Sequence, residues 1–262
     1  MKQSLILSLF HFFILSFLFS SCDDIAEADR LTYVALPEVK RAVLIEDFTG
    51  QRCVNCPAAT EQIKALQEQY GEDKVIAVAI HGGGFGVAST NTRMTGLATP
   101  DATEYYTHWN ISAQPSGMVC RQGVLDYNDW TEAVAKALSQ TSPIELTLSQ
   151  SNGTIEVKAI ASTRYEGKLQ LWIVEDGITA PQANAQGKLE MDYVHHHIYR
   201  GSVNGLWGTA VSLGESVFTQ SFPIDWTTID TVTAADYATR QLSCIAFFYN
   251  DNGVQQVSKI SL

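Results

Sequence analysis

Two cysteines, at positions 53 and 56, are the residues of this chain whose types and spacing are best suited to chemistry. A continuous apolar segment precedes them, and a segment of helical pattern beginning at Pro57 follows them. Unpaired amides and the dipole at the start of a helix favour a thiolate, the attacking species in disulfide exchange. Cys53 is then the exposed nucleophile, and Cys56, one turn away, is the buried resolving thiol. The alternative is a static structural disulfide.

Two charged residues near the pair extend this interpretation. Arg52 adds positive potential beside Cys53. Asp47 lies near the apolar residues Ile45 and Phe48 in the preceding segment, so we expect it on a buried strand, where a carboxyl without a basic partner has a raised pKa. It would then exchange protons with the resolving thiol. The alternative for Asp47 is a surface or capping acid.

The number of cysteines argues against a zinc site. The chain has five cysteines, and two of them, Cys120 and Cys244, have no near cysteine neighbour. A second zinc-type pair is therefore missing, and we predict neither a metal nor a cofactor. We expect Cys120 and Cys244 to be small buried core residues, with a disulfide between them as the alternative.

The first 21 residues have the pattern of an export signal. Lys2 gives a basic start, residues 5–19 are almost wholly apolar, and two serines stand directly before Cys22. Small residues before a cysteine resemble a bacterial lipobox, so we expect a signal peptide over 1–21, a lipid on Cys22 and a polar tether over 22–39. The alternatives are an ordinary signal cleaved near the serines, or a short anchor.

Export and charge restrict the partners. The pair Asp23–Asp24 resembles the signal that directs some Gram-negative lipoproteins to the surface of the outer membrane. We therefore expect an exported protein anchored to that membrane by its lipid, in a compartment where disulfides persist. The net charge of −11 argues against a nucleic-acid partner, which needs clustered Lys and Arg.

Hydrophobic periodicity predicts two domains. Apolar runs at 41–48 and 75–80 flank a helical pattern at 57–70, which gives a βαβ unit with parallel strands. After residue 141 the pattern changes to short strands separated by turns, which favours a β-sandwich of immunoglobulin-like type over 142–262. The strands expected there are 144–148, 155–161, 169–174, 193–199, 216–222, 242–249 and 254–260.

The segment around the cysteines resembles thioredoxins. Asp47-Phe48 followed by Cys53 is similar to the approach to their active site, and the segment 109–116 is similar to the one that carries their cis proline, here Pro115. The resemblance implies an α/β thioredoxin-like domain over 40–141. It also implies a proton-accepting role for Asp47 and a substrate groove shaped by Pro115. Val54-Asn55 and Arg52 depart from the thioredoxin pattern, so the redox potential does not carry over.

The whole layout resembles a second family, the thioredoxin-like outer-membrane lipoproteins called outer membrane protein twenty-eight related. The motif at 47–57 and the segment 193–200 carry this likeness. We predict a thiol-disulfide oxidoreductase acting through Cys53 and Cys56 on extracytoplasmic protein thiols or disulfides. The alternative is a non-catalytic surface lipoprotein with a structural disulfide, whose C-terminal domain binds an unknown protein or glycan ligand.

Histidines and tryptophans of the second half leave further alternatives open. His195 and His197 fall on one face of the strand predicted at 193–199, where two imidazoles could bind a metal; otherwise this is a polar strand face. Three tryptophans are either core residues or a carbohydrate-binding face. They are Trp172, Trp207 and Trp226.

Overall fold

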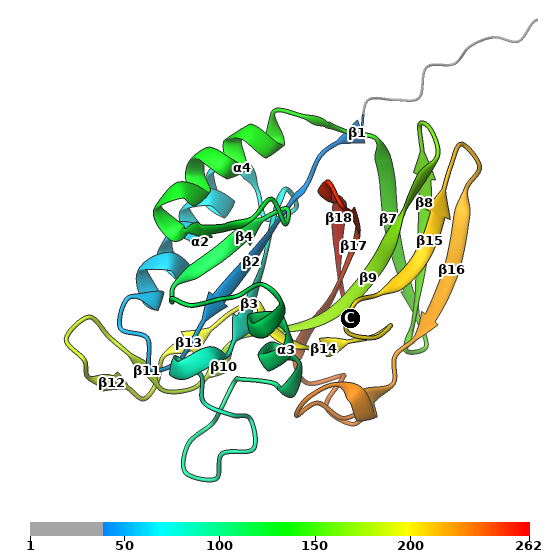
Figure 1. The fold of residues 1–262 in the computed structure, drawn as a ribbon. Coiled ribbons are helices and arrows are strands. Elements are labelled where there is room, and N and C mark those ends of the chain that lie inside the picture. Colours follow the sequence, from blue (N-terminus) through cyan, green and yellow to red (C-terminus); the bar gives the residue numbers. More distant parts are fainter. Residues whose placement is uncertain (1–38) are drawn as a thin grey trace, which may run out of the picture. The chain divides into compact units, whose positions relative to one another are not determined.

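A nine-stranded mixed sheet runs through residues 39–262, which are the residues that the structure, a computed structural model, describes (Figure 1). The strand order is β18-β17-β9-β14-β3-β2-β4-β5, and β15 pairs with β9. The protein is thus mostly β-sheet with few helices. The predicted signal peptide, Cys22 and all but the last residue of the predicted tether lie outside the described residues. The strands are β2 (Val43–Thr49), β3 (Val75–His81), β4 (Ser116–Val119), β5 (Val124–Asp126), β9 (Tyr165–Asp176), β14 (Ile198–Ser202), β15 (Thr209–Leu213), β17 (Gln241–Asn250) and β18 (Gly253–Ser261).

Continuous apolar runs form the parallel pair β2 and β3, and helix α2 (Cys56–Tyr70) joins them. All seven residues of β2 are buried, as expected of a strand covered on both faces. Helix α2 has Pro57 in its first turn, where a proline costs no hydrogen bond, and it is followed by Gly71, whose φ of 102° favours glycine. Helices α3 (Pro100–His108) and α4 (Trp130–Leu138) complete this half, and β4 pairs antiparallel with β2.

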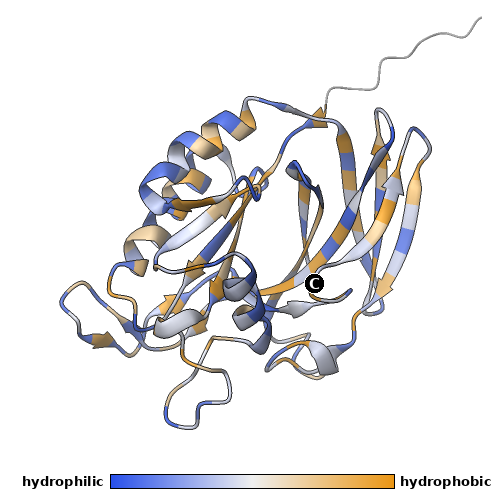
Figure 2. Cartoon of the chain, in the orientation of Figure 1, coloured by the Kyte–Doolittle hydropathy of each residue, from blue (hydrophilic) through white to orange (hydrophobic). Residues whose placement is uncertain are grey.

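A second, three-stranded sheet covers one side of the long strands β9 and β17. Its order is β16-β8-β7, with β7 at Ile144–Ser151, β8 at Thr154–Ala161 and β16 at Phe218–Pro223. Residues of β8 and β16 alternate in hydropathy (Figure 2), which is the pattern of a sheet with one face in the core. Apolar side chains of β7, β8, β9 and β17 form one buried cluster between the sheets, as in a β-sandwich.

The two predicted segments share one sheet. Strand β14 lies parallel to β3, with Ile198 opposite Ala79, and the Ala79 amide donates to the His197 carbonyl at 2.8 Å. The described residues 39–262 form one compact unit. The predicted domain boundary between residues 141 and 142 therefore separates strands that belong to one continuous sheet. That 40–141 and 142–262 fold independently stays a prediction.

The strand predicted at 193–199 is interrupted. The two-residue strand β13 (Val194–His195) pairs with β10 (Ile178–Thr179), and β14 begins only at Ile198. His197 between them has a φ of 59°, a left-handed conformation that a strand cannot accommodate. The prediction of one strand was therefore wrong. The remaining short pairs are β1 (Val39–Lys40) with β6 (Thr141–Ser142), and β11 (Gln182–Ala183) with β12 (Leu189–Glu190).

The described tryptophans of the second half belong to the packing of the protein. Trp172 is fully buried, its ring lies edge-on to Tyr105 at 5.4 Å between centroids, and its Nε1 donates to the Tyr105 hydroxyl. Trp207 packs on the same tyrosine, and Trp226 packs on Tyr237. A carbohydrate-binding role for Trp172 is thus excluded by its burial. No helix among residues 39–262 is long and apolar enough to cross a membrane.

Candidate functional site

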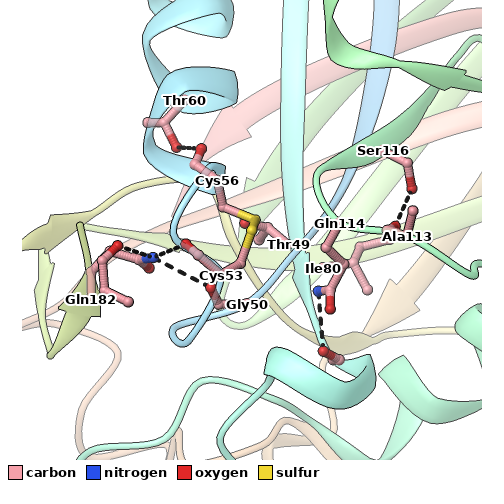
Figure 3. The surroundings of a disulfide bond; sticks show 12 residues. Thr49, Gly50, Cys53, Cys56, Thr60, Ile80, Ala113, Gln114, Ser116 and Gln182 are labelled. Atoms are coloured by element: carbon pink, nitrogen blue, oxygen red, sulfur yellow. Dashed lines mark hydrogen bonds between the residues drawn. A yellow bond between two sulfur atoms is a disulfide. The ribbon is translucent and has the colours of Figure 1, made fainter. Parts of the chain in front are cut away.

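Cys53 and Cys56 form a disulfide at the point where β2 leads into α2 (Figure 3). Their Cα atoms are 5.4 Å apart, and Cys56 is the first residue of the helix. The exposed fractions are 3% for Cys53 and 1% for Cys56. The prediction that Cys53 is exposed was therefore wrong, while Cys56 is buried as expected. Cys120 and Cys244 are free thiols, and both are buried.

Strand β11 covers the disulfide loop through contacts that the sequence analysis missed. The Gln182 side-chain amide donates to the carbonyls of Cys53 at 2.9 Å and Gly50 at 3.4 Å (Figure 3). The Ala183 amide donates to the Gln51 carbonyl at 2.7 Å. No local pattern marks Gln182, because its partners lie far away in the sequence. The loop is thus held against a segment of the second half of the chain.

Asp47 lies on β2 behind the disulfide and is 1% exposed. Its Oδ1 has no hydrogen-bond partner among the described residues. Burial raises the pKa of its carboxyl to about 8, because charging the group would require desolvation without compensation. Asp47 is thus a buried and mostly neutral acid, not a surface acid.

A small polar cavity lies beside Asp47 and Cys56. Its volume is about 20 Å³. His81, at the end of β3, and His195, on β13, contribute to its wall, and their ring centroids are 5.3 Å apart. Burial lowers the pKa of both imidazoles, that of His195 to about 4. No sequence pattern connects these two histidines with Asp47.

Arg52 and Pro115 differ in solvent exposure. The Arg52 side chain is exposed and makes no ion pair with a described residue, and its backbone amide donates to the Phe85 carbonyl at 2.9 Å. Pro115 is buried, and the peptide bond between Gln114 and Pro115 is cis. In the view of Figure 3, Gln114 lies on the opposite side of the disulfide from Gln182.

His195 and His197 do not form a common site. His195 is buried, and its Nε2 lies 3.2 Å from the Ala180 carbonyl oxygen. His197 instead points to Asp176, with Nδ1 3.1 Å from the carboxylate, because its left-handed backbone turns it away. Within residues 39–262 no group of three or more His, Cys, Asp or Glu side chains is arranged to hold a metal ion.

Exposed apolar side chains lie on the disulfide loop and on the two segments that hydrogen-bond to it, and no sequence pattern marks them. Seven large hydrophobic residues of the described chain are exposed, and two of them, Val124 and Val217, lie on other segments. The other five lie on the disulfide loop, on the loop that accepts the Arg52 amide, or on the segment from β11 to β13. They are Val54, Phe85, Leu189, Met191 and Val194, with exposed fractions between 38% and 64%. We call these five residues the apolar rim.

Comparisons with known proteins give the family. The structure is similar to that of HBP35 of Porphyromonas gingivalis, with 17% identity, a TM-score of 0.61, and coverage of 86% of this chain and 76% of that chain. It is also similar to protein AGR_C_4864 from Agrobacterium tumefaciens, with 15% identity, a TM-score of 0.53, and coverage of 86% and 96%. At these identities the likeness shows the fold alone. No curated protein matches the sequence. The model of the family described as outer membrane protein Omp28 matches residues 102–262, so the chain belongs to the Omp28 family, whose name points to the outer membrane.

Proposed function

We propose that this chain is a non-catalytic protein of the outer membrane that binds a protein partner through the apolar rim. In this proposal the lipid on Cys22 anchors it, and the Cys53–Cys56 disulfide shapes the binding surface without exchanging with substrates. The observation that carries the proposal is the covered disulfide: both cysteines are buried, and Gln182 is bonded to the loop carbonyls above them. Membership of an outer membrane protein family supports the location.

A thioredoxin-like segment over 40–141 is the scaffold in this proposal. The parallel strands β2 and β3, the connecting helix α2 with a cysteine at each side of its start, and the antiparallel strand β4 support it. The rest of the chain then adds strands to this unit and supplies β11, which closes over the disulfide.

Burial argues against rapid exchange at the disulfide. Attack by a thiolate requires access to a sulfur atom along the S–S axis. Cys53, the cysteine on the loop, is 3% exposed. Access therefore requires the Gln182 segment to move, and its hydrogen bonds to Cys53 and Gly50 oppose that motion.

Reduction by a dithiol is therefore expected to be slow in the wild type and faster in Gln182→Ala. Loss of two hydrogen bonds, each contributing about 1 kcal/mol, corresponds to roughly a thirtyfold increase in the rate if opening limits it. Alkylation and mass spectrometry after timed exposure to dithiothreitol measure this rate. Gln186→Ala, an exposed glutamine of the same hairpin, is the matched control and should behave as the wild type.

A thiol-disulfide oxidoreductase is the second candidate function, and Asp47 is the observation that favours it. A buried neutral carboxyl beside Cys56 is suited to exchange a proton with a resolving thiol. This candidate requires turnover of a model disulfide substrate by the wild type and its loss in Cys53→Ser. Rapid reduction of the wild type together with such turnover would replace the binding proposal by this one.

Binding at the apolar rim is tested with an unfolded, carboxymethylated polypeptide as the probe. Replacing Leu189 and Met191 by serine is expected to weaken binding of the probe by a factor of about a hundred or more, because each buried apolar side chain contributes about 1.5–3 kcal/mol. Fluorescence anisotropy of the labelled probe measures the affinity. Val217→Ser removes an equally exposed side chain elsewhere and should leave the affinity unchanged. Equal affinities for all variants would place the binding surface elsewhere.

A further inference from the structure

A cavity of about 580 Å³ lies at the end of β2 that is away from the disulfide. Helix α4 lines one side of it, and the turns that follow β4 and β17 line the other. Arg41, which stands just before β2, also lines it, whereas Cys53 follows the far end of the same strand. Small-molecule sites in proteins have volumes of about 300–1,000 Å³. The cavity is thus large enough for a ligand of its own, separate from the disulfide.

The side of the cavity opposite α4 is held in place by the backbone. The Val254 amide donates to the Cys120 carbonyl at 2.8 Å, and the Gln122 side chain donates to the Asn252 carbonyl at 2.6 Å. Gly253 has a φ of 83°, and a Cβ there would lie 2.3 Å from the Cys120 carbonyl oxygen, so this close approach requires glycine. The turn after β17 is therefore fixed against the turn after β4, and the cavity does not need a ligand to form.

Arg41 brings a positive charge to this cavity without a carboxylate to balance it. Its side chain is partly buried, and its Nη1 donates to the Gln140 side chain and its Nη2 to the Val254 carbonyl, both at 2.6 Å. It forms no ion pair with any residue of 39–262. Charges that are withdrawn from water are normally paired, and a guanidinium has further N–H donors to offer. A carboxylate on a ligand would supply the missing charge.

The charged side chains of α4 are ordered by sign along the cavity. Asp129 and Glu132 line it at the start of the helix, and Lys136 lines it one turn before Gln140, which is the partner of Arg41. This order also complements the helix dipole, but Arg41 lies outside the helix and adds to the same basic end. The step from Asp129 to Lys136 corresponds to about 10 Å of helix axis, and an extended chain of three residues is of similar length.

The remaining wall of the cavity is suited to a peptide. Apolar side chains of modest size provide contacts for small side chains. They are Val119, Leu125, Ala133 and Ala137. Side-chain amides provide hydrogen bonds for main-chain amides. They are those of Gln122, Asn252 and Gln255.

We propose that this cavity binds a short peptide with free ends, about three residues long. Its carboxylate lies at Arg41 and Lys136, and its ammonium group lies at the start of α4, beside Asp129. A neutral glycan has no charged ends, and a nucleotide has no cation for the acidic end, so neither uses both ends of the cavity. The proposal goes beyond the proposed function, because no residue of the apolar rim lines this cavity.

Trialanine is the probe, and titration of the isotope-labelled protein followed by amide chemical shifts measures both its affinity and its position. Trialanine amide, which lacks the carboxylate, should bind at least about tenfold more weakly, because hydrogen bonds of Arg41 to a charged group are lost. N-acetyl-trialanine, which lacks the ammonium group, should bind about threefold more weakly, because the acids at that end are exposed. Alanine is too short to reach both ends and should bind at least about tenfold more weakly than trialanine.

Two exposed side chains at opposite ends of the cavity give variants that do not disturb the core. Lys136→Gln should weaken the binding of trialanine about threefold and leave that of trialanine amide unchanged. Asp129→Asn should weaken the binding of trialanine about threefold and leave that of N-acetyl-trialanine unchanged. Lys64→Gln, an exposed lysine of α2 outside the cavity, is the control and should bind all three peptides like the wild type.

Three results would each overturn the proposal. The first is the absence of shift changes at the cavity with trialanine at about 10 mM. The second is an equal affinity for the three peptides, because the charged ends would then contribute nothing. The third is an equal affinity for alanine and trialanine, because the ligand would then be a single amino acid. Binding at the apolar rim is measured with a different probe and different variants, so failure of one proposal is distinguishable from failure of the other.

Discussion

Replacing Arg121 by methionine is expected to lower the free energy of unfolding by about 3–5 kcal/mol, because it leaves a carboxylate buried without a partner. Arg121 donates from Nε and Nη2 to the Glu46 carboxylate at 3.0–3.2 Å, and the two side chains are 2% and 0% exposed. Urea unfolding followed by circular dichroism measures the change. The pair ties β2 to the turn between β4 and β5.

The surroundings of Arg121 explain why the expected loss of stability is large. Four aromatic rings lie within 4.3–5.6 Å of its guanidinium carbon, so cation–π attraction is lost together with the ion pair. These rings belong to Trp109, Trp172, Phe247 and Tyr249. Strands β9 and β17 supply three of them, so the variant weakens the packing between the two halves of the chain.

Two controls make this prediction specific. Arg164→Met removes an exposed ion pair with Glu166, which should have no measurable effect on unfolding. The double variant Glu46→Met, Arg121→Met should recover a large part of the loss, because it removes both charges from the core. Unchanged stability of Arg121→Met would show that the ion pair contributes little.

Local patterns predicted the elements near the disulfide because their signals are contained in short segments. The continuous apolar run of β2 and the helical spacing of Ala59, Ile63 and Leu66 place a buried strand before a helix with one buried face, as observed. The burial of Asp47 followed from its apolar neighbours. Such features need no knowledge of distant parts of the chain.

Long-range pairing was not predictable from these patterns. Strand β14 lies beside β3, and β11 covers the disulfide loop, through contacts between residues more than a hundred positions apart. An apolar run shows that a strand is buried but not which strand covers it. For this reason the exposure of Cys53 was predicted wrongly, although the helix start that positions the pair was predicted correctly.

Replacing Asp47 by asparagine is expected to stabilise the protein, and the gain should grow with pH. Burial raises the pKa of the folded Asp47 from 3.8 to about 8, so the native state retains a proton that the unfolded chain releases. Stability attributable to Asp47 therefore falls as the pH rises from about 4 to about 8, and it is constant above that window. Asparagine has a similar size and does not titrate.

The difference in unfolding free energy between Asp47→Asn and the wild type should widen by roughly 4 kcal/mol from about pH 5 to about pH 9. Urea unfolding at a series of pH values measures it. His81 and His195 have lowered pKa values, so their contribution to the stability of the fold decreases as the pH falls. Both proteins contain these histidines, so this opposite pH dependence cancels in the difference between them. Glu132→Gln, an exposed acid on α4, is the control and should follow the wild type. A difference that stays constant with pH would mean that Asp47 is charged in the folded protein.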